Sequence, residues 1–425
     1  MIIATLCLSL LLLMFIGVPI ALALGLSSAI VLNQQGMPLI ALAQSVFESL
    51  NSFSLMAVPF FILAGNLMQS GGIAKRLVNL ANALLGWVRG GLGGVVVLTS
   101  MFFSTMSGSS SATTAAVGSL LIPAMEKKGY PRPFAASVSA SSGELGSLIP
   151  PSITMIIYAL STNVSVASIF LAGILPGLLV GVSLILCTCL IAWLRNYDVI
   201  ESVSLRQWSI GVLVAFKQAF FAILMPVVIL GGIYTGLFTP TEASVVAVIY
   251  GLIVGLFVYR EMSWSDLIGV LGRSAITSAI VLVIVAFAAI FAYMLTINRV
   301  PHLLGGLITG ISDNPLVFLL VTNLLLFVVG MFIEALAAII ILAPILAPAA
   351  MQFGIDPVHF ATIMIINLAV GMTTPPVGVN LFVVCQVANV SMEQLMRPMA
   401  IFLGVLIVDV LIVTYVPLLS TWFLP

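Results

Sequence analysis

The chain has 425 residues, of which 62% are hydrophobic and 6% are charged, against roughly 25% charged in an ordinary soluble protein. Its mean hydropathy is +1.31, and 13 basic residues balance 13 acidic ones, so the formal net charge is zero. This composition excludes a soluble globular domain, and the lack of basic excess argues against a nucleic-acid partner. It predicts an all-α polytopic protein in a lipid bilayer.

Motifs of several other protein classes are missing from the sequence. The 4 cysteines lie inside apolar segments, which argues against a disulfide framework or a metal cluster. No segment matches G-x-x-x-x-G-K-[ST], so we expect no ATP motor in this chain. The apolar stretch that starts at Met1 lacks a basic n-region and a cleavage site, so we expect it to be a retained membrane helix.

The first predicted elements precede residue 90. Residues 3–32 are apolar around Gly17-Val18-Pro19 and form either one tilted helix or two short ones, of which the repeat described below favours two. Residues 36–51 are predicted to be an interfacial connector, and residues 53–70 a membrane span. From Ile73 to Leu84, apolar residues recur at helical spacing between polar ones, which is typical of a helix lying in the membrane surface.

Residues 90–126 are predicted to form a re-entrant helical hairpin. The segment from Gly90 to Met125 contains no charge, and a cluster of small polar residues from Ser107 to Thr114 lies at its middle. Lysines and arginines flank both ends, and basic loops collect on the cytoplasmic face. Both ends therefore lie on the cytoplasmic side, with the tip near the midplane, where it must face protein or a water-filled cavity.

The next predicted element is a helix at residues 134–162. We expect it to be broken, because Pro150-Pro151 removes two backbone donors at its middle. Residues 196–217 are predicted to be a cytoplasmic linker. A second hairpin is expected at residues 314–355, entered from the outside because no lysine or arginine occurs between Arg299 and Arg397. A second broken helix is expected at residues 358–390, around Pro375-Pro376. The remaining predicted spans are residues 166–194, 218–237, 241–259, 274–297 and 399–421.

Ten spans and two hairpins place 12 of the 13 basic residues on the cytoplasmic face if the N-terminus lies outside. Only Arg299 is then external. Because the number of spans is even, both termini are predicted to be periplasmic.

Residues that determine backbone shape recur at an offset of 225. The matching positions are Pro123 with Pro348, Gly129 with Gly354, Gly146 with Gly371, and Pro150-Pro151 with Pro375-Pro376. The offset divides the chain into a first repeat at residues 1–195 and a second at residues 218–425. Each repeat has an odd number of crossings, so the second is inverted relative to the first. Inverted repeats with discontinuous helices are typical of secondary transporters, whose sites lie at the midplane.

The tips and breaks supply the candidate binding residues. Half-helix N-termini attract anions, and unwound carbonyls and hydroxyls suit Na⁺. The candidate substrate ligands are Ser109, Ser110, Ser111, Thr113, Thr114, Thr374 and Pro375. The candidate Na⁺ ligands are Ser107, Ser142, Gly143, Gly146, Gly330, Gly371 and Thr373.

Three carboxylates lie in predicted membrane segments. Glu144 and Glu334 fall at a break and at a hairpin tip, where an ionisable group is either functional or satisfied by local backbone donors. Asp409 in the last span is expected to be a scaffold contact.

Together these motifs resemble the large membrane subunit of tripartite ATP-independent periplasmic (TRAP) transporters over essentially the whole chain. The resemblance rests on Gly108-Ser109-Ser110-Ser111-Ala112-Thr113, Pro123-Ala124-Met125 through Gly129-Tyr130, Ile149-Pro150-Pro151-Ser152, Pro240-Thr241-Glu242-Ala243 and Thr374-Pro375-Pro376-Val377-Gly378.

The resemblance implies a bacterial inner-membrane protein of the ion-transporter superfamily that works as an elevator. It further implies import of organic acids, typically C4-dicarboxylates or sialic acid, driven by a Na⁺ gradient. Two partners are implied as well: a small four-helix membrane subunit and a periplasmic substrate-binding protein.

Two alternative functions stay open on the residues alone. A H⁺-coupled organic-anion carrier would use Glu144 or Glu334. An intramembrane hydrolase would need a base beside a tip serine. The only two histidines, His302 and His359, fall at the outer ends of segments in the second half, which argues against the hydrolase.

Overall fold

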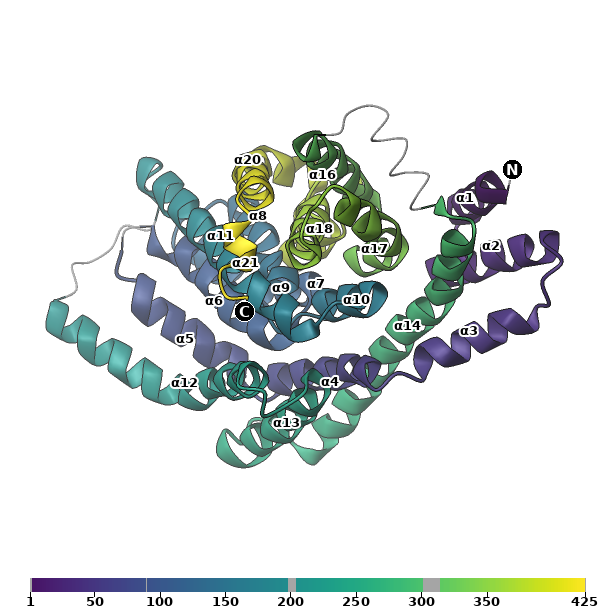
Figure 1. The fold of residues 1–425 in the computed structure, drawn as a ribbon. Coiled ribbons are helices and arrows are strands. Elements are labelled where there is room, and N and C mark those ends of the chain that lie inside the picture. Colours follow the sequence, from purple (N-terminus) through teal and green to yellow (C-terminus); the bar gives the residue numbers. More distant parts are fainter. Residues whose placement is uncertain (1, 89, 198–203, 301–313, 425) are drawn as a thin grey trace.

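The computed structural model describes residues 2–88, 90–197, 204–300 and 314–424, and the regular structure of these residues is entirely helical (Figure 1). The elements of the first half are α1 (Ile2–Phe15), α2 (Ile20–Gln34), α3 (Ile40–Leu50), η1 (Ser54–Met56), α4 (Ala57–Ser70), α5 (Ile73–Leu85), α6 (Gly91–Ser107), α7 (Ser110–Lys127), α8 (Arg132–Gly143), α9 (Leu145–Leu148), α10 (Ile153–Thr162) and α11 (Val166–Leu194).

The elements of the second half are α12 (Leu205–Tyr234), α13 (Pro240–Ile253) with a π-helical end η2 (Val254–Val258), α14 (Trp264–Ile297), α16 (Pro315–Phe332), α17 (Ala335–Gln352), α18 (Pro357–Gly371), α19 (Val379–Ala388), α20 (Met392–Tyr415) and α21 (Leu418–Thr421). Within the described residues, 7 helices are long and apolar enough to cross a membrane, or up to 9 if each bent pair counts as one span. The chain is a polytopic all-α membrane protein.

Several predicted boundaries differ from the structure. Residues 205–217 of the predicted linker belong to α12, while residues 198–203 lie outside the described part. The spans predicted to start at 274 and 399 begin at Trp264 and Met392. Residues 3–32 form the two short helices α1 and α2, and the span predicted at 53–70 is a helix of 14 residues that continues from α3 after a bend of 66°.

The helix boundaries reproduce the offset of 225 residues. Adding 225 to Ser110–Lys127, the bounds of α7, gives Ala335–Gln352, the bounds of α17. The same addition moves the end of α6 at Ser107 to the end of α16 at Phe332, and the start of α8 to the start of α18. Both proline pairs contain a cis peptide bond.

Contacts between the two repeats are reciprocal. α7 packs against α19, and its counterpart α17 packs against α10, the counterpart of α19. Likewise α8 contacts α20 while α18 contacts α11. A pseudo-two-fold relation between the repeats requires this exchange of partners. The fold is therefore an inverted repeat in which each hairpin meets the broken helix of the other half.

The helices form two layers, which Figure 1 shows one above the other. We name α1–α5 with α12–α14 the arc, because they curve along one side of the molecule. We name α6–α11 with α16–α21 the body, because they gather on the concave side of the arc. The layers meet where α4 and α5 contact α6 and where α14 contacts α17.

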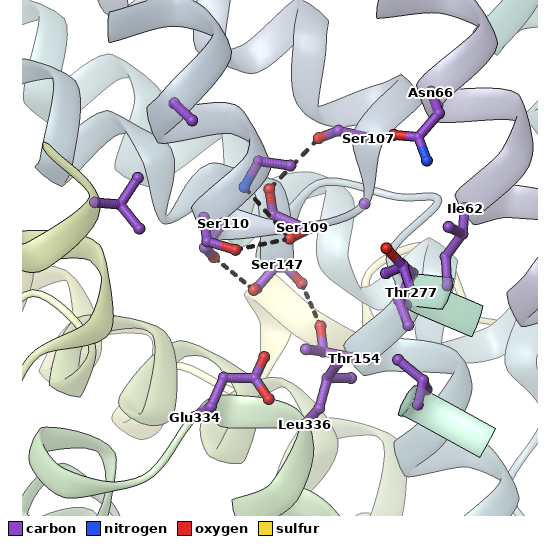
Figure 2. Close-up of a pocket in the computed structure, with 18 of the residues that line it drawn as sticks. Ile62, Asn66, Ser107, Ser109, Ser110, Ser147, Thr154, Thr277, Glu334 and Leu336 are labelled. Carbon is purple, nitrogen blue, oxygen red and sulfur yellow. Dashed lines mark hydrogen bonds between the residues drawn. The ribbon is translucent and has the colours of Figure 1, made fainter. Parts of the chain in front are cut away.

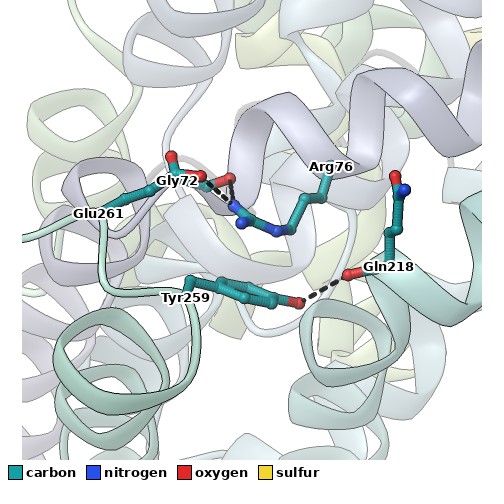
Figure 3. A network of polar contacts seen from close by, with 5 residues as sticks. All are labelled: Gly72, Arg76, Gln218, Tyr259 and Glu261. Carbon is teal, nitrogen blue, oxygen red and sulfur yellow. Dashed lines mark hydrogen bonds and ion pairs between the residues drawn. The ribbon is translucent and has the colours of Figure 1, made fainter.

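Arg76 holds α5 within the arc (Figure 3). Its guanidinium forms an ion pair of 2.7 Å with Glu261 and donates a hydrogen bond of 2.9 Å to the Gly72 carbonyl. It also lies 3.7 Å from the centroid of the Tyr259 ring, and the Tyr259 hydroxyl donates to the Gln218 carbonyl. These contacts join α5 to the α13–α14 connection and to α12.

Candidate functional site

The tip of the first hairpin is a tight turn between α6 and α7. Gly108 ends α6 in the left-handed region with φ +59°, and a Cβ there would lie 3.0 Å from the Pro151 carbonyl oxygen. Ser109 follows in extended conformation and caps α7, because its hydroxyl accepts a hydrogen bond from the Ala112 amide. Glycine and serine are thus required by the turn itself, before any role in binding.

The tip of the second hairpin places Glu334 at the equivalent position. Adding 225 to 109 gives 334, and Glu334 is the N-cap residue of α17 as Ser109 is of α7. The sequence repeat therefore continues into the site, with a carboxylate in one half where the other half has a hydroxyl.

Each hairpin is bonded to the broken helix of its own repeat through the backbone. The Ile153 amide, which starts α10, donates to the Gly108 carbonyl at 3.2 Å. In the second half, the amide of Gly378, the N-cap residue of α19, donates to the Met331 carbonyl at 3.0 Å.

Glycines permit this close approach of tip and break. A methyl group at Gly146 would overlap the Ser109 carbonyl oxygen. In the second repeat, a Cβ at Gly371 would lie 2.6 Å from the Cα of Gly330. The glycines predicted as Na⁺ ligands, Gly143 and Gly146 in the first repeat and Gly330 and Gly371 in the second, thus lie where a hairpin meets a break. Gly146 and Gly371 are the pair that the offset of 225 relates.

A cavity of about 530 Å³ lies between the arc and the two hairpin tips (Figure 2). The body contributes the first tip, the start of α10 and the second tip, while α4 and α14 of the arc form the opposite wall. Its polar lining residues are Asn66, Gln69, Ser107, Ser109, Ser110, Ser111, Ser147, Thr154, Thr277 and Glu334.

Hydrogen bonds fix the serines at one side of the cavity. The Ser110 and Ser147 hydroxyls are 2.6 Å apart, and the Thr154 hydroxyl donates to the Ser147 carbonyl at 3.0 Å. Figure 2 shows the Glu334 carboxylate pointing toward this group from the second tip. The hydroxyls are therefore preorganised on a rigid frame.

Three helix ends and one carboxylate set the electrostatics of the cavity. Residues at the N-termini of α7, α10 and α17 line it, and each N-terminus places the positive end of a helix dipole there. Among the described residues that line it, Glu334 is the one charged side chain and no lysine, arginine or histidine occurs. Such a site can bind an anion through helix N-termini and hydroxyls.

Four predicted substrate ligands do not line this cavity. Thr113 and Thr114 are buried behind the first tip, and the Thr113 hydroxyl bonds to that of Ser107 at 2.8 Å. Thr374 and Pro375 lie in the second break, where the Thr374 hydroxyl donates to the Val370 carbonyl. These residues support the tips and breaks.

The predicted Na⁺ ligands fall into two groups, one per repeat. The Ser142 hydroxyl lies 3.0 Å from that of Ser100 and donates to the Ser139 carbonyl, and the Thr373 hydroxyl donates to the Val370 carbonyl. Both hydroxyls are fully buried and keep a free lone pair. Their role in binding Na⁺ stays a prediction.

Sequence reasoning missed the polar residues of the arc. Asn66 and Thr277 line the cavity, and the Asn66 amide donates to the Ser274 hydroxyl at 2.8 Å. The signal was present, since Asn66 and Gln69 are polar residues inside an apolar span. It was not specific enough to place them opposite the tip.

His359 offers no base to the serines of the tip. It is buried near the start of α18, its Nε2 lies 3.2 Å from the Thr414 carbonyl, and it does not line the cavity. His302 lies outside the described residues.

Residues 7–419 match the family model "Tripartite ATP-independent periplasmic transporter, DctM component". The chain belongs to this TRAP transporter family. It is 44% identical, over 89% of its length and 88% of the relative's, to the C4-dicarboxylate TRAP transporter large permease protein DctM of Pseudomonas aeruginosa. It is 39% identical, over 91% and 90%, to the sialic acid TRAP transporter large permease protein SiaM of Vibrio cholerae. The resemblance stated from the motifs is confirmed, and the relatives are transporter permease subunits, not enzymes.

Two further likenesses bear on assembly and on fold. The chain is 42% identical to the isethionate TRAP transporter permease protein DctMQ of Oleidesulfovibrio alaskensis; the match covers 96% of this chain and spans 64% of that relative's length. The solved YdaH transporter of Alcanivorax borkumensis superimposes with a TM-score of 0.65, over 90% of this chain and 88% of the other. At 19% identity this second likeness concerns the fold alone.

Proposed function

We propose that this TRAP subunit imports an organic acid across the bacterial inner membrane, driven by a Na⁺ gradient. The observation that carries the proposal is the cavity between the two hairpin tips, which three helix N-termini line. A carboxylate bound there would accept hydrogen bonds from backbone amides and from the serine hydroxyls. C4-dicarboxylates and sialic acid are the substrate classes named for the relatives DctM and SiaM.

The substrate reaches the chain through partners in this proposal. A periplasmic binding protein delivers the acid, and a small four-helix membrane subunit completes the membrane part. The fused name DctMQ of the Oleidesulfovibrio relative, which is longer than this chain, supports a second membrane subunit.

Coupling to Na⁺ follows from the charge that must move. An anion entering a cell that is negative inside moves against the potential, at roughly 2.3 kcal/mol per charge per 100 mV. One Na⁺ at each hairpin–break contact would offset that cost for a monovalent acid. The first site would use the region of Ser107, Ser142, Gly143 and Gly146, and the second that of Gly330, Gly371 and Thr373.

We further propose that the body moves against the arc as an elevator. The cavity lies at the boundary of these two layers, so a displacement of the body would carry the tips along α14 while the arc remains in place. The substrate could then bind at one face of the membrane and be released at the other without a channel opening through the body.

Transport by proteoliposomes tests the function. The chain would be reconstituted with its small subunit and binding protein, and uptake of a panel of organic acids measured with and without a Na⁺ gradient. We expect uptake that needs Na⁺, ignores ATP and accelerates when the interior is made negative. Ser110→Ala, in the cavity, should raise the substrate concentration for half-maximal uptake. Ser119→Ala should not, because Ser119 is an exposed residue of α7 that does not line the cavity.

Glu334 distinguishes Na⁺ coupling from proton coupling. Glu334→Gln should keep the dependence on Na⁺ and voltage if the carboxylate only contacts substrate or backbone. Uptake driven by a pH gradient in the wild type and lost in this variant would instead establish the H⁺-coupled carrier.

A further inference from the structure

Glu144 is a buried carboxylate with one neutral partner. It lies at the junction of α8 and α9, is 2% exposed, and its Oε1 accepts a hydrogen bond of 2.6 Å from Asn380 Nδ2. Its Oε2 has no hydrogen-bond partner among the described residues. Both ion pairs of the described chain, Arg76–Glu261 and Arg132–Glu126, lie elsewhere. A buried charge in this setting needs a counter-charge.

Two more buried oxygens without a partner belong to residues around Glu144. Asn380 Oδ1 and Thr114 Oγ1 make no hydrogen bond within the described structure, and both residues are 0% exposed. Thr114 lies directly against Gly143, because a methyl group on that glycine would overlap its hydroxyl. Thr114 lies in α7, Asn380 lies in α19 and Glu144 directly follows α8, and these three helices pack against one another.

We propose that Glu144, Asn380 and Thr114 bind a Na⁺ ion between the two repeats. Carboxylate, amide and hydroxyl oxygens are ligands of hard cations, and the ion would supply the counter-charge that Glu144 lacks. Within the described residues no three His, Cys, Asp or Glu side chains cluster, which argues against a transition metal. This Na⁺ site is additional to the two Na⁺ sites of the proposed function, and the observations that support it do not depend on them.

The site would couple the breaks of the two repeats. Asn380 bonds to Glu144 in the first break through its side chain, and its backbone amide donates to the Met372 carbonyl in the second break at 3.1 Å. An ion held by Glu144 and Asn380 therefore fixes the two breaks in one arrangement. Release of the ion would free them to change their relative position.

Equilibrium binding of ²²Na⁺ to the full chain in nanodiscs tests this site. We expect Glu144→Gln to lower the number of Na⁺ ions bound at saturation by one per chain, because the amide keeps the bond to Asn380 but lacks the charge. Thr114→Val, which removes one ligand, should weaken one class of site about tenfold and serves if the first variant does not fold. Glu126→Gln, a carboxylate exposed on α7, is the matched control and should bind as the wild type does.

Unchanged Na⁺ stoichiometry in folded Glu144→Gln, with unchanged affinity in Thr114→Val, would overturn the site. If protons alone neutralise Glu144, the variant loses proton binding but keeps every Na⁺, which also overturns it. Uptake that still requires Na⁺ in that case would leave the proposed function intact. Absence of Na⁺-dependent uptake in the wild type would instead reject the proposed function, whatever the binding measurement gives.

Discussion

Ser183 donates a hydrogen bond of 2.5 Å to Asp409 Oδ2, and the two residues occupy equivalent positions in the two repeats. Beyond the breaks the offset between repeats is 226, which relates the N-cap residues Ser165 and Ser391 and also relates 183 to 409. The bond therefore lies where α11 meets α20, at the pseudo-two-fold axis. Asp409 is a contact within the body, in line with its expected structural role.

We expect Ser183→Ala to destabilise the body. Asp409 is 2% exposed, and a hydrogen bond to a charged group contributes about 1.5–3 kcal/mol to the free energy of unfolding. Asp409→Asn should cost less, because its amide oxygen can still accept from the Ser183 hydroxyl. Thermal melting of the purified variants measures the difference; equal melting temperatures for Ser183→Ala and the wild type would contradict this role.

The repeat could be predicted because it is carried by residues that determine the backbone. Glycine and proline fix turns and breaks whatever surrounds them, so Gly146, Gly371 and the two proline pairs marked the register without a structure. The contact of Glu144 with Asn380 could not be predicted in this way. It joins side chains of different repeats, and no local pattern records how two repeats pack.

The missed helix starts were predictable from local chemistry. α12, α14 and α20 each begin with a capping box, in which the N-cap serine and the side chain three residues later exchange hydrogen bonds. The pairs are Ser204 with Gln207, Ser263 with Asp266, and Ser391 with Gln394. A boundary predicted from the apolar run alone falls after this polar first turn, because the turn has the composition of a loop.

The predicted topology can be tested with single cysteines in a background without the four native ones. Asn79→Cys on α5 and Lys128→Cys after α7 are exposed positions, and both should react only with a thiol reagent applied from the cytoplasmic side. Glu48→Cys, in the predicted interfacial connector, should react only from the periplasm, because the predicted topology with an external N-terminus places this connector on the outer side. Gly72, which directly precedes α5, is unsuitable for a cysteine substitution, because it has φ +75° and a Cβ there would overlap the Glu261 side chain. Periplasmic labelling at residue 79 or 128 would refute the re-entrant hairpin.

Loss of the Arg76 contacts should loosen α5 from the arc. Arg76→Ala removes the ion pair with Glu261 and the stacking on Tyr259, and partly exposed contacts of these kinds contribute about 0.2–1 and 0.5–1 kcal/mol. Arg76→Lys keeps the charge but not the planar stacking, so its effect should be smaller. Hydrogen exchange of the α5 amides measures the change. Protection in Arg76→Ala equal to that of the wild type would show that apolar packing alone holds the helix.

The contact between Gly330 and Gly371 should tolerate no side chain. In Gly371→Ala the new methyl group would lie 2.6 Å from the Cα and 2.7 Å from the carbonyl carbon of Gly330, both backbone atoms that cannot rotate away. Overpacking of this kind typically costs about 1–3 kcal/mol, and relief would require α16 to separate from α18. Since this contact forms the second hairpin–break junction, we expect Gly371→Ala to lose most of its Na⁺-dependent uptake and to melt at a lower temperature. Gly404→Ala is the matched control, because a Cβ at this position in α20 meets no atom within 4 Å. It should transport and melt as the wild type does; a Gly371→Ala protein that behaves like Gly404→Ala would show that the two helices do not need this approach.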